Sequence, residues 1–146
     1  MADLVVKSPV FESNKQIPKK YSCDGEEVNP PLTVDGIPTA AKTLALVVDD
    51  PDAPRGTFDH WVVYNIPPTT KIGENSVPGT QGVNSANQHG YIGMCPPSGT
   101  HRYFFKVYAL DTKLDLKPEN THKKDLEKAM QGHILAKGEL IGLYNR

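Results

Sequence analysis

The sequence has no long apolar segment, no block of like charges and little cysteine. No apolar run in its 146 residues approaches the roughly 20 residues that a membrane-spanning helix needs. Its 16 basic and 17 acidic residues are dispersed, which argues against a nucleic-acid-binding or polybasic membrane surface. The N-terminus lacks the basic segment and apolar stretch of a signal peptide. We therefore expect a soluble, cytoplasmic protein with no nucleic-acid partner and no transmembrane segment.

Only two cysteines are present, and the common enzyme motifs are absent. Cys23 and Cys95 could pair, although two cysteines in a cytoplasmic protein are more often free thiols, so the sequence leaves both alternatives open. The chain has no G-x-S-x-G, P-loop, dinucleotide fingerprint or HExxH motif. We expect a protein that is not an enzyme and needs no cofactor.

Proline and glycine are abundant, with 13 and 12 residues. Together with a modest 38% of apolar residues, they indicate many turns on a β-rich frame rather than a helical bundle. The length fits one domain over residues 1–146.

Three segments are typical of strands. Residues 44–49 form a continuous apolar run, which favours a strand buried on both faces. From His60, alternation predicts that His60, Val62, Tyr64 and Ile66 share one face, opposite Trp61, Val63 and Asn65. Residues 101–110 alternate in the same way and are rich in aromatic and β-branched residues.

Shorter strands are expected within residues 4–11, at residues 32–34 and at residues 139–144. One helix is predicted near the C-terminus, with Thr121 as its N-cap and Gly132 as its stop. Residues 69–100 have little periodicity and predict a long, functional loop region. The expected fold is an antiparallel β-sandwich with six to eight strands and one short α-helix.

An acidic, proline-stiffened turn joins two of these strands. Asp50 and Asp52 lie in the sequence D-D-P-D-A-P at residues 49–54, directly after the buried run. Asp and Pro also make good turns without any functional role, so the turn alone does not decide between the two interpretations. Loops at strand ends do, however, often carry function.

Two histidines begin the alternating strands, His60 and His101. If both strands start at the same end of the sheet, the imidazoles and carboxylates converge into a preformed site. Imidazoles beside a Gly/Pro loop suit a small anion such as phosphate, and the carboxylates suit a cationic headgroup. Two histidines and one carboxylate also describe a metal site, although no closely spaced ligand pair supports one. A thiolate at Cys95 is a further chemical candidate beside the structural interpretation.

Three separated motifs resemble the phosphatidylethanolamine-binding protein family, in its compact bacterial and archaeal, Raf-kinase-inhibitor-like branch. They are D-P-D-A-P at residues 50–54, D-H-W-V-V-Y-N-I-P at residues 59–67, and G-Y-I-G-M-C-P-P-S-G-T-H-R-Y at residues 90–103. The resemblance implies a large antiparallel sheet packed on a smaller one with Greek-key connections. It also implies a pocket for phosphate, carboxylate or a phosphoethanolamine headgroup. The ligand-binding residues it implies are Asp50, Asp52, Ala53, His60, Cys95, Pro96, Pro97, His101 and Tyr103.

The chain departs from the family pattern at Met94, Phe58, Val34 and Asn29, none of which is a polar pocket group. No counterpart follows Arg146 for the C-terminal helix that borders the pocket in animal members. We therefore expect a pocket that is open or covered by a second subunit, since dimers occur in the bacterial branch.

The leading functional hypothesis is a non-enzymatic binding protein for a small anion or phospholipid headgroup, with a regulatory role in signalling. One alternative is a protein inhibitor whose partner is a kinase or serine protease, and another is an uncharacterised hydrolase or metal enzyme.

Overall fold

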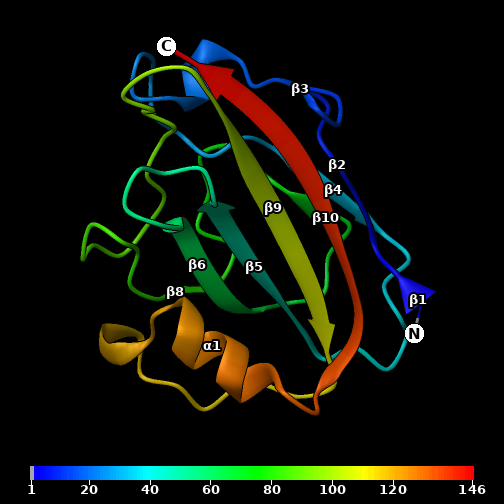
Figure 1. Cartoon of the computed structure of the whole chain (residues 1–146). Coiled ribbons are helices and arrows are strands. Elements are labelled where there is room, and N and C mark those ends of the chain that lie inside the picture. Colours follow the sequence, from blue (N-terminus) through cyan, green and yellow to red (C-terminus); the bar gives the residue numbers. More distant parts are fainter. Residues whose placement is uncertain (1) are drawn as a thin grey trace.

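Four long strands form the centre of a large sheet. The computed structural model describes residues 2–146. The four strands lie in the order β10-β9-β5-β6, and each is antiparallel to its neighbour (Figure 1). The long connection after β6 places β9 beside β5, a crossover of the Greek-key type that was expected. The strands are β5 (Thr43–Asp50), β6 (Phe58–Ile66), β9 (Thr100–Leu110) and β10 (Ile134–Asn145).

Six short strands complete the two sheets, so residues 2–146 contain ten strands rather than six to eight. Most of the additional ones have two residues, too few for a periodicity to reveal them. Two of them run parallel to β10, an exception to the antiparallel arrangement. The large sheet gains β1 (Ala2–Asp3), β3 (Lys15–Gln16) and β8 (Thr80–Gln81), and the small sheet consists of β2 (Val5–Lys7), β4 (Leu32–Asp35) and β7 (Lys71–Ile72).

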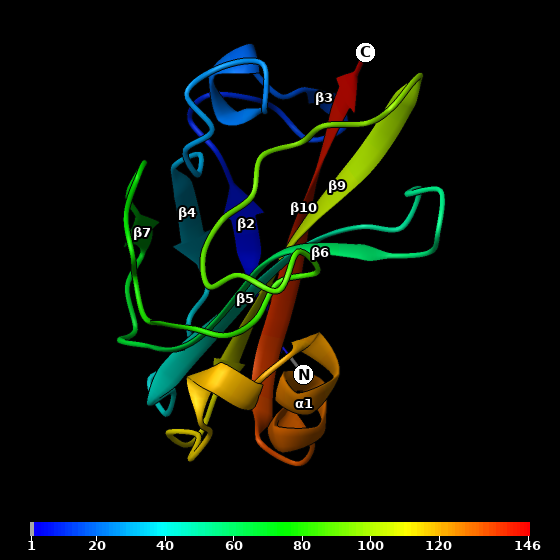
Figure 2. The same ribbon diagram turned by 90° about the vertical axis from the view of Figure 1, so that its left-hand side faces the viewer.

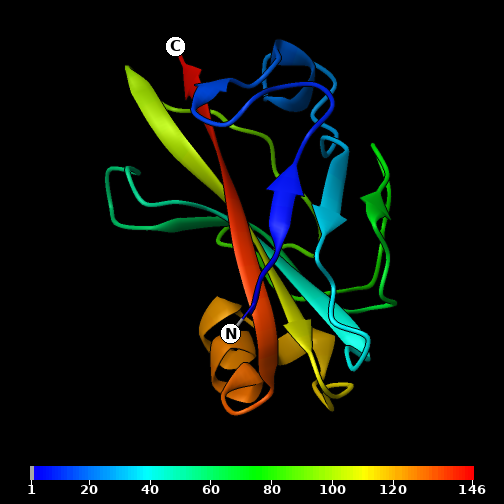
Figure 3. The ribbon, with the colours of Figure 1, turned by 90° about the vertical axis from the view of Figure 1, so that its right-hand side faces the viewer.

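The small sheet and the helix α1 (Lys123–Met130) cover opposite faces of the large sheet, as Figures 2 and 3 show from two sides. The core therefore has two parts. Leu46 and Val48 of β5 belong to the cluster between the sheets, whereas Ala45 and Val47 belong to the cluster beneath α1. Every residue of β5 is buried for this reason, which confirms the interpretation of its continuous apolar run.

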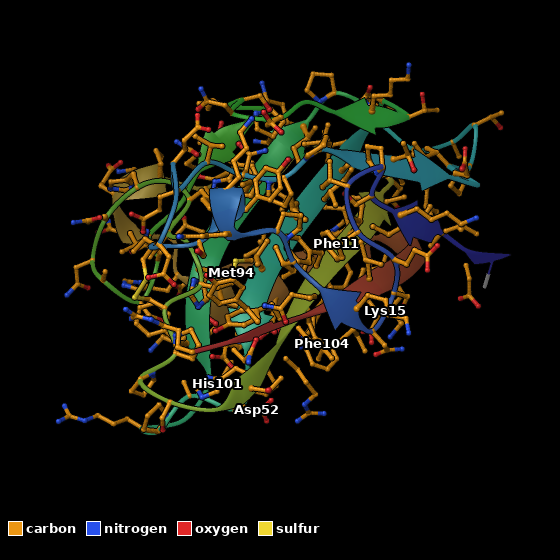
Figure 4. The ribbon with its side chains drawn as sticks, turned by 90° about the horizontal axis from the view of Figure 1, so that it is seen from above. Phe11, Lys15, Asp52, Met94, His101 and Phe104 are labelled. Carbon is orange, nitrogen blue, oxygen red and sulfur yellow. A yellow bond between two sulfur atoms is a disulfide. The ribbon has the colours of Figure 1, made fainter. Side chains whose placement is uncertain are left out.

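Strand β9 alternates as the sequence predicts. Tyr103 and Phe105 are buried in the cluster between the sheets, while Arg102 and Lys106 face away from it. Figure 4 shows Phe104 and Phe11 on opposite sides of the sheet, and Phe11 packs against Phe105 with ring centroids 5.7 Å apart. His101 continues the inward-facing series at the start of the strand.

Helix α1 begins one residue later than predicted. Its N-cap is His122, whose backbone N–H donates to the Asp125 carboxylate at 3.0 Å. Thr121 instead donates its hydroxyl to the Lys117 carbonyl at 2.8 Å, at the end of the 3-10 helix η2 (Pro118–Asn120). The Thr121 side chain is thus used by the preceding turn, and the prediction of Thr121 as N-cap is wrong.

No helix in residues 2–146 is long and apolar enough to span a bilayer.

The two cysteines form a disulfide, which decides between the two alternatives that the sequence left open. Cys23 follows the 3-10 helix η1 (Lys19–Tyr21), and Cys95 lies 72 residues further along the chain, with a Cα–Cα distance of 5.4 Å. The backbone also joins the two segments here, because the Cys23 N–H donates to the Met94 carbonyl at 3.1 Å. This proximity arises from the packing of distant segments, which local sequence patterns do not encode.

We predict that removing this disulfide lowers the free energy of unfolding. A cross-link that closes a loop of this length restricts the unfolded chain and contributes about 4 kcal/mol in the chain-entropy model. The variant Cys23→Ala/Cys95→Ala should therefore unfold at a lower guanidinium concentration than the oxidised protein. The wild type in excess reductant is the matched control and should unfold together with the variant. Coincident curves for the oxidised wild type and the variant would contradict the prediction.

Candidate functional site

Three chain segments meet at one edge of the large sheet: the end of β5 and the starts of β6 and β9. In the strand register, Asp50 pairs with Phe58 of β6, and Asp49 pairs with Phe104 of β9. Because both pairings are antiparallel, the starts of β6 and β9 lie beside the end of β5. The condition on which His60 and His101 were expected to converge is met.

A β-bulge turns His60 toward the inner face of the sheet. Val48 pairs with Trp61, but the next residue of β5 pairs with Asp59, so β6 has one extra residue, His60. The His60 ring consequently lies 5.3 Å, centroid to centroid, from the inward-facing Tyr103. The predicted alternation, with His60 and Trp61 on opposite faces, is wrong at this point, because a bulge interrupts the two-residue period.

A second irregularity in β6 changes the face of Ile66. Asn65 has a φ of 53°, and the register shifts between the pairs of Leu46 with Val63 and Leu44 with Ile66. Ile66 therefore joins Val63 in the cluster between the sheets instead of sharing a face with Tyr64.

Asp50 and His101 form a buried pair. The His101 Nδ1–H donates to Asp50 Oδ2 at 2.7 Å. The other oxygen of Asp50 accepts the Asp52 backbone N–H at 2.8 Å, which closes the turn after β5. Both oxygens of Asp50 are thus occupied by the protein, and the carboxylate orients His101 rather than His60.

Asp52 lies beside this site but does not line its cavity. Its two oxygens accept Nε and Nη2 of Arg102, at 2.9 and 2.8 Å, and Oδ2 also accepts the Arg102 backbone N–H at 2.9 Å. These bonds lower the pKa of the Asp52 carboxyl to about 2. Figure 4 shows Asp52 close to His101, at the start of β9. Asp52 ties the turn to β9, and its expected place among the ligand-binding residues is not supported by this geometry.

The segments enclose a cavity of about 170 Å³. Its walls are mainly apolar, and its polar side chains come from the strand ends. Four of the lining residues were given no role from the sequence, although three of them lie within the quoted motifs and the fourth, Phe58, directly precedes one. Of the predicted residues, Asp50, Ala53, His60, Cys95, Pro96, Pro97, His101 and Tyr103 line the cavity; the four further residues are Pro54, Phe58, Ile92 and Gly93.

Ile92 has a role that no sequence signal indicated. Its carbonyl accepts the His60 Nδ1–H at 2.8 Å, and its N–H donates to the His60 carbonyl at 3.0 Å. A carbonyl oxygen can only accept, so Nδ1 of His60 carries the hydrogen. Burial lowers the pKa of His60 below its ordinary value of 6.5, which favours the neutral ring.

Both histidines therefore use Nδ1 within the protein and leave Nε2 as the remaining ring nitrogen. In the described part of the chain, neither Nε2 has a hydrogen-bond partner, and both atoms keep some exposure to solvent. The Tyr103 hydroxyl adds a third polar group, and burial together with nearby Asp50 raises its pKa, so it remains protonated. The residues lining the cavity include no Lys or Arg.

The metal and thiolate hypotheses receive no support from the geometry. Within residues 2–146, no three His, Cys, Asp or Glu side chains gather as metal ligands. Cys95 is part of the disulfide and is not a thiol.

Comparison with known proteins agrees with this fold. The family model for phosphatidylethanolamine-binding protein matches residues 7–145. The chain belongs to this family. A UPF0098 protein of Methanothermobacter thermautotrophicus is 50% identical over 149 residues, covering 97% of this chain and 98% of the relative.

Solved structures extend the comparison. A crystal structure described as a putative phosphatidylethanolamine-binding protein homolog from Chlamydia trachomatis has a TM-score of 0.94 at 41% identity, covering 99% of this chain and 98% of that one. YbcL of Escherichia coli, described as a member of the mammalian family, has a TM-score of 0.90 at 29% identity and covers 99% of both chains. A carboxypeptidase Y inhibitor in complex with its proteinase shares the fold alone, with a TM-score of 0.54 at 18% identity.

We predict that His60 makes the protein less stable in mild acid. The folded-state pKa of His60 lies below its unfolded value, so between these two values the unfolded chain binds more protons. The free energy of unfolding should therefore fall as pH decreases below about 6.5. Thermal unfolding at pH 7 and pH 5 should show a smaller loss for His60→Gln than for the wild type. His89→Gln, at an exposed ring, is the control; equal losses in wild type and His60→Gln would contradict the assignment.

Proposed function

We propose that this protein is a non-enzymatic binding protein whose cavity takes a phosphate, a carboxylate or a phosphoethanolamine-type headgroup. The observation that carries the proposal is the pair of buried imidazoles, each held through Nδ1 and each leaving Nε2 for the cavity. The Asp50 carboxylate holds the His101 ring through Nδ1, so Nε2 is the ring nitrogen left to contact a ligand. Membership in the phosphatidylethanolamine-binding protein family supports a binding role.

The size and stiffness of the cavity fit a headgroup. A volume of about 170 Å³ equals the share of roughly five or six water molecules in the liquid, enough for a small polar group. Pro96 and Pro97 form part of the cavity wall and directly follow Cys95, which is fixed by the disulfide. The same segment is also held by Tyr91, which donates its hydroxyl to the Tyr21 carbonyl at 2.8 Å. A cavity held in this way needs little ordering when a ligand enters.

The same residues argue for binding rather than catalysis. An Asp–His pair is part of the machinery of many hydrolases, where it activates a Ser or Cys nucleophile. No Ser, Thr or free Cys is among the residues lining the cavity, and the Tyr103 hydroxyl is held in its protonated form.

Isothermal titration with inorganic phosphate and O-phosphoethanolamine at pH 6 tests the proposal. Loss of one charged hydrogen bond should weaken binding about 10- to 100-fold, so we expect this loss in His101→Gln and at least tenfold weakening in His60→Ala. His89→Ala, outside the cavity, should bind like the wild type. Circular dichroism confirms that each variant is folded. Absence of binding by the wild type, or unchanged binding by His60→Ala, would rule out this function.

A second candidate, a protein inhibitor of a kinase or serine protease, rests on the exposed loop at residues 73–77. Buried Asn29 holds this loop: its side chain donates to the Gly73 carbonyl at 2.9 Å and accepts the Ser76 N–H at 2.9 Å. Val77, which follows, is 69% exposed, unusual for a large apolar residue. Inhibition that persists in His60→Ala/His101→Gln but is lost in Val77→Asp would favour this candidate.

A further inference from the structure

The disulfide between Cys23 and Cys95 is accessible from solvent. Cys95 is exposed and also lines the cavity, and Cys23 is partly exposed. A thiolate that reaches a disulfide attacks one sulfur and releases the other, and the better-stabilised thiolate is the better leaving group. The surroundings of the two sulfurs therefore decide which cysteine is released.

A guanidinium lies against only one of the two sulfurs. Nη1 of Arg146 donates to Cys95 Sγ at 3.1 Å, and no such contact is made to Cys23 Sγ in the described part of the chain. The residue next to Cys23 is instead an acidic one, Asp24. A neighbouring arginine stabilises negative charge on sulfur. Charge that develops during exchange is therefore better accommodated on Cys95 than on Cys23.

Arg146 is held in this position through both its backbone and its side chain. Its N–H donates to the Gly99 carbonyl at 3.2 Å, and its carbonyl accepts the Gly99 N–H at 3.1 Å. Its Nη2 lies 3.3 Å from Oδ1 of Asp24, and Oδ2 of Asp24 accepts the Tyr144 hydroxyl at 2.8 Å. The guanidinium is thus directed at the disulfide by partners on both of the segments that the disulfide joins.

Contacts that do not involve sulfur also keep the two cysteines together. The Cys23 N–H donates to the Met94 carbonyl at 3.1 Å, and Ser22 and Met94 form an isolated β-bridge. Ser22 is fully buried, and its hydroxyl donates to the Lys19 carbonyl at 2.8 Å. The two thiols formed by reduction therefore stay adjacent at a high effective concentration, and the disulfide can form again without refolding of the chain.

We propose that the Cys23–Cys95 disulfide is a redox-active site that exchanges reversibly with a dithiol, and that Cys95 is the sulfur released first. One thiolate of the dithiol attacks Cys23 Sγ, the S–S bond of the protein breaks, and its electron pair leaves on Cys95 beside Arg146. The second thiolate of the dithiol then attacks the reagent sulfur of the mixed disulfide and releases Cys23. The dithiol is oxidised to its own disulfide, and its two protons pass to the two reduced cysteines.

This exchange removes one of the anchors of the cavity wall. Pro96 directly follows Cys95, whereas the hydrogen bond from the Tyr91 hydroxyl to the Tyr21 carbonyl involves no sulfur and remains after reduction. We therefore expect reduction to loosen residues 95–99 and to leave the strands in place. The redox site does not depend on the anion proposed for the cavity.

Peptide mapping identifies the sulfur that is attacked. The protein is mixed briefly with the monothiol mercaptoethanol and quenched in acid, which stops exchange by protonating thiolates. Digestion with pepsin and mass spectrometry should then find the mercaptoethanol adduct on Cys23 and a free thiol at Cys95. An adduct found mainly on Cys95 would overturn the assignment of the leaving sulfur.

The rate of reduction by dithiothreitol tests the role of Arg146. We expect the initial rate to fall about three- to tenfold in Arg146→Gln and to recover in large part in Arg146→Lys. A merely structural role would have the opposite effect, because a loosened C-terminal segment would expose the disulfide and speed its reduction. Arg55→Gln, which removes an exposed arginine in the turn after β5, should react like the wild type, and circular dichroism confirms that each variant is folded. An unchanged or increased rate in Arg146→Gln would overturn the proposal.

Hydrogen exchange of the oxidised and reduced wild type tests the effect on the wall. The backbone amides of Cys95, Ser98 and Gly99 should exchange faster in the reduced protein, while those within β9 keep their protection. Equal exchange in the two forms would overturn the link between the disulfide and the cavity wall. Faster exchange throughout the chain would mean that reduction unfolds the protein, and would overturn reversible exchange in the folded state.

Discussion

The buried hydrogen bond between Asp50 and His101 organises the candidate site. It joins the end of β5 to the start of β9 across 51 residues of sequence, and it sets the ring orientation of His101. The same carboxylate closes the turn through the Asp52 N–H, and Asp52 is bound in turn by Arg102, the neighbour of His101. Two adjacent residues of β9 thus hold the acidic turn from opposite sides. Both contacts position the turn whose residues 53 and 54 form part of the cavity wall.

The opposite wall depends on a different set of long-range contacts. The disulfide between Cys23 and Cys95 and the hydrogen bond from the Tyr91 hydroxyl to the Tyr21 carbonyl fasten residues 91–97 to η1 and the residues that follow it. The Gly93 N–H adds a bond to the Glu27 carboxylate at 3.1 Å. Two walls anchored to separate parts of the chain produce a cavity whose shape does not depend on a ligand. That arrangement suits recognition by complementarity.

Much of the fold was predictable because its signals are local. The continuous apolar run of β5 reflects two covered faces, and the alternation in β9 places His101, Tyr103 and Phe105 on one side. Two-residue strands such as β3 and β8 leave no such signal. They are strands because they pair with a neighbouring strand, and two residues are too few to show a period. The N-cap of α1 was misplaced because the Thr121 hydroxyl has two competing backbone partners, and only the fold selects between them.

The sequence by itself determined the fold class, the acidic turn and the two histidines at strand starts, since each depends on residue type and short-range period. The tertiary structure decided what those residues do. A bulge at His60 turns the ring inward, and the Ile92 carbonyl fixes the tautomer of that ring. Arg102 binds Asp52 beside the cavity, and Cys23 forms a disulfide with Cys95. The partners in the last three contacts are 32 to 72 residues apart, and the bulge is defined by pairing with another strand. Such contacts depend on how strands register and pack, which no local pattern of residues records.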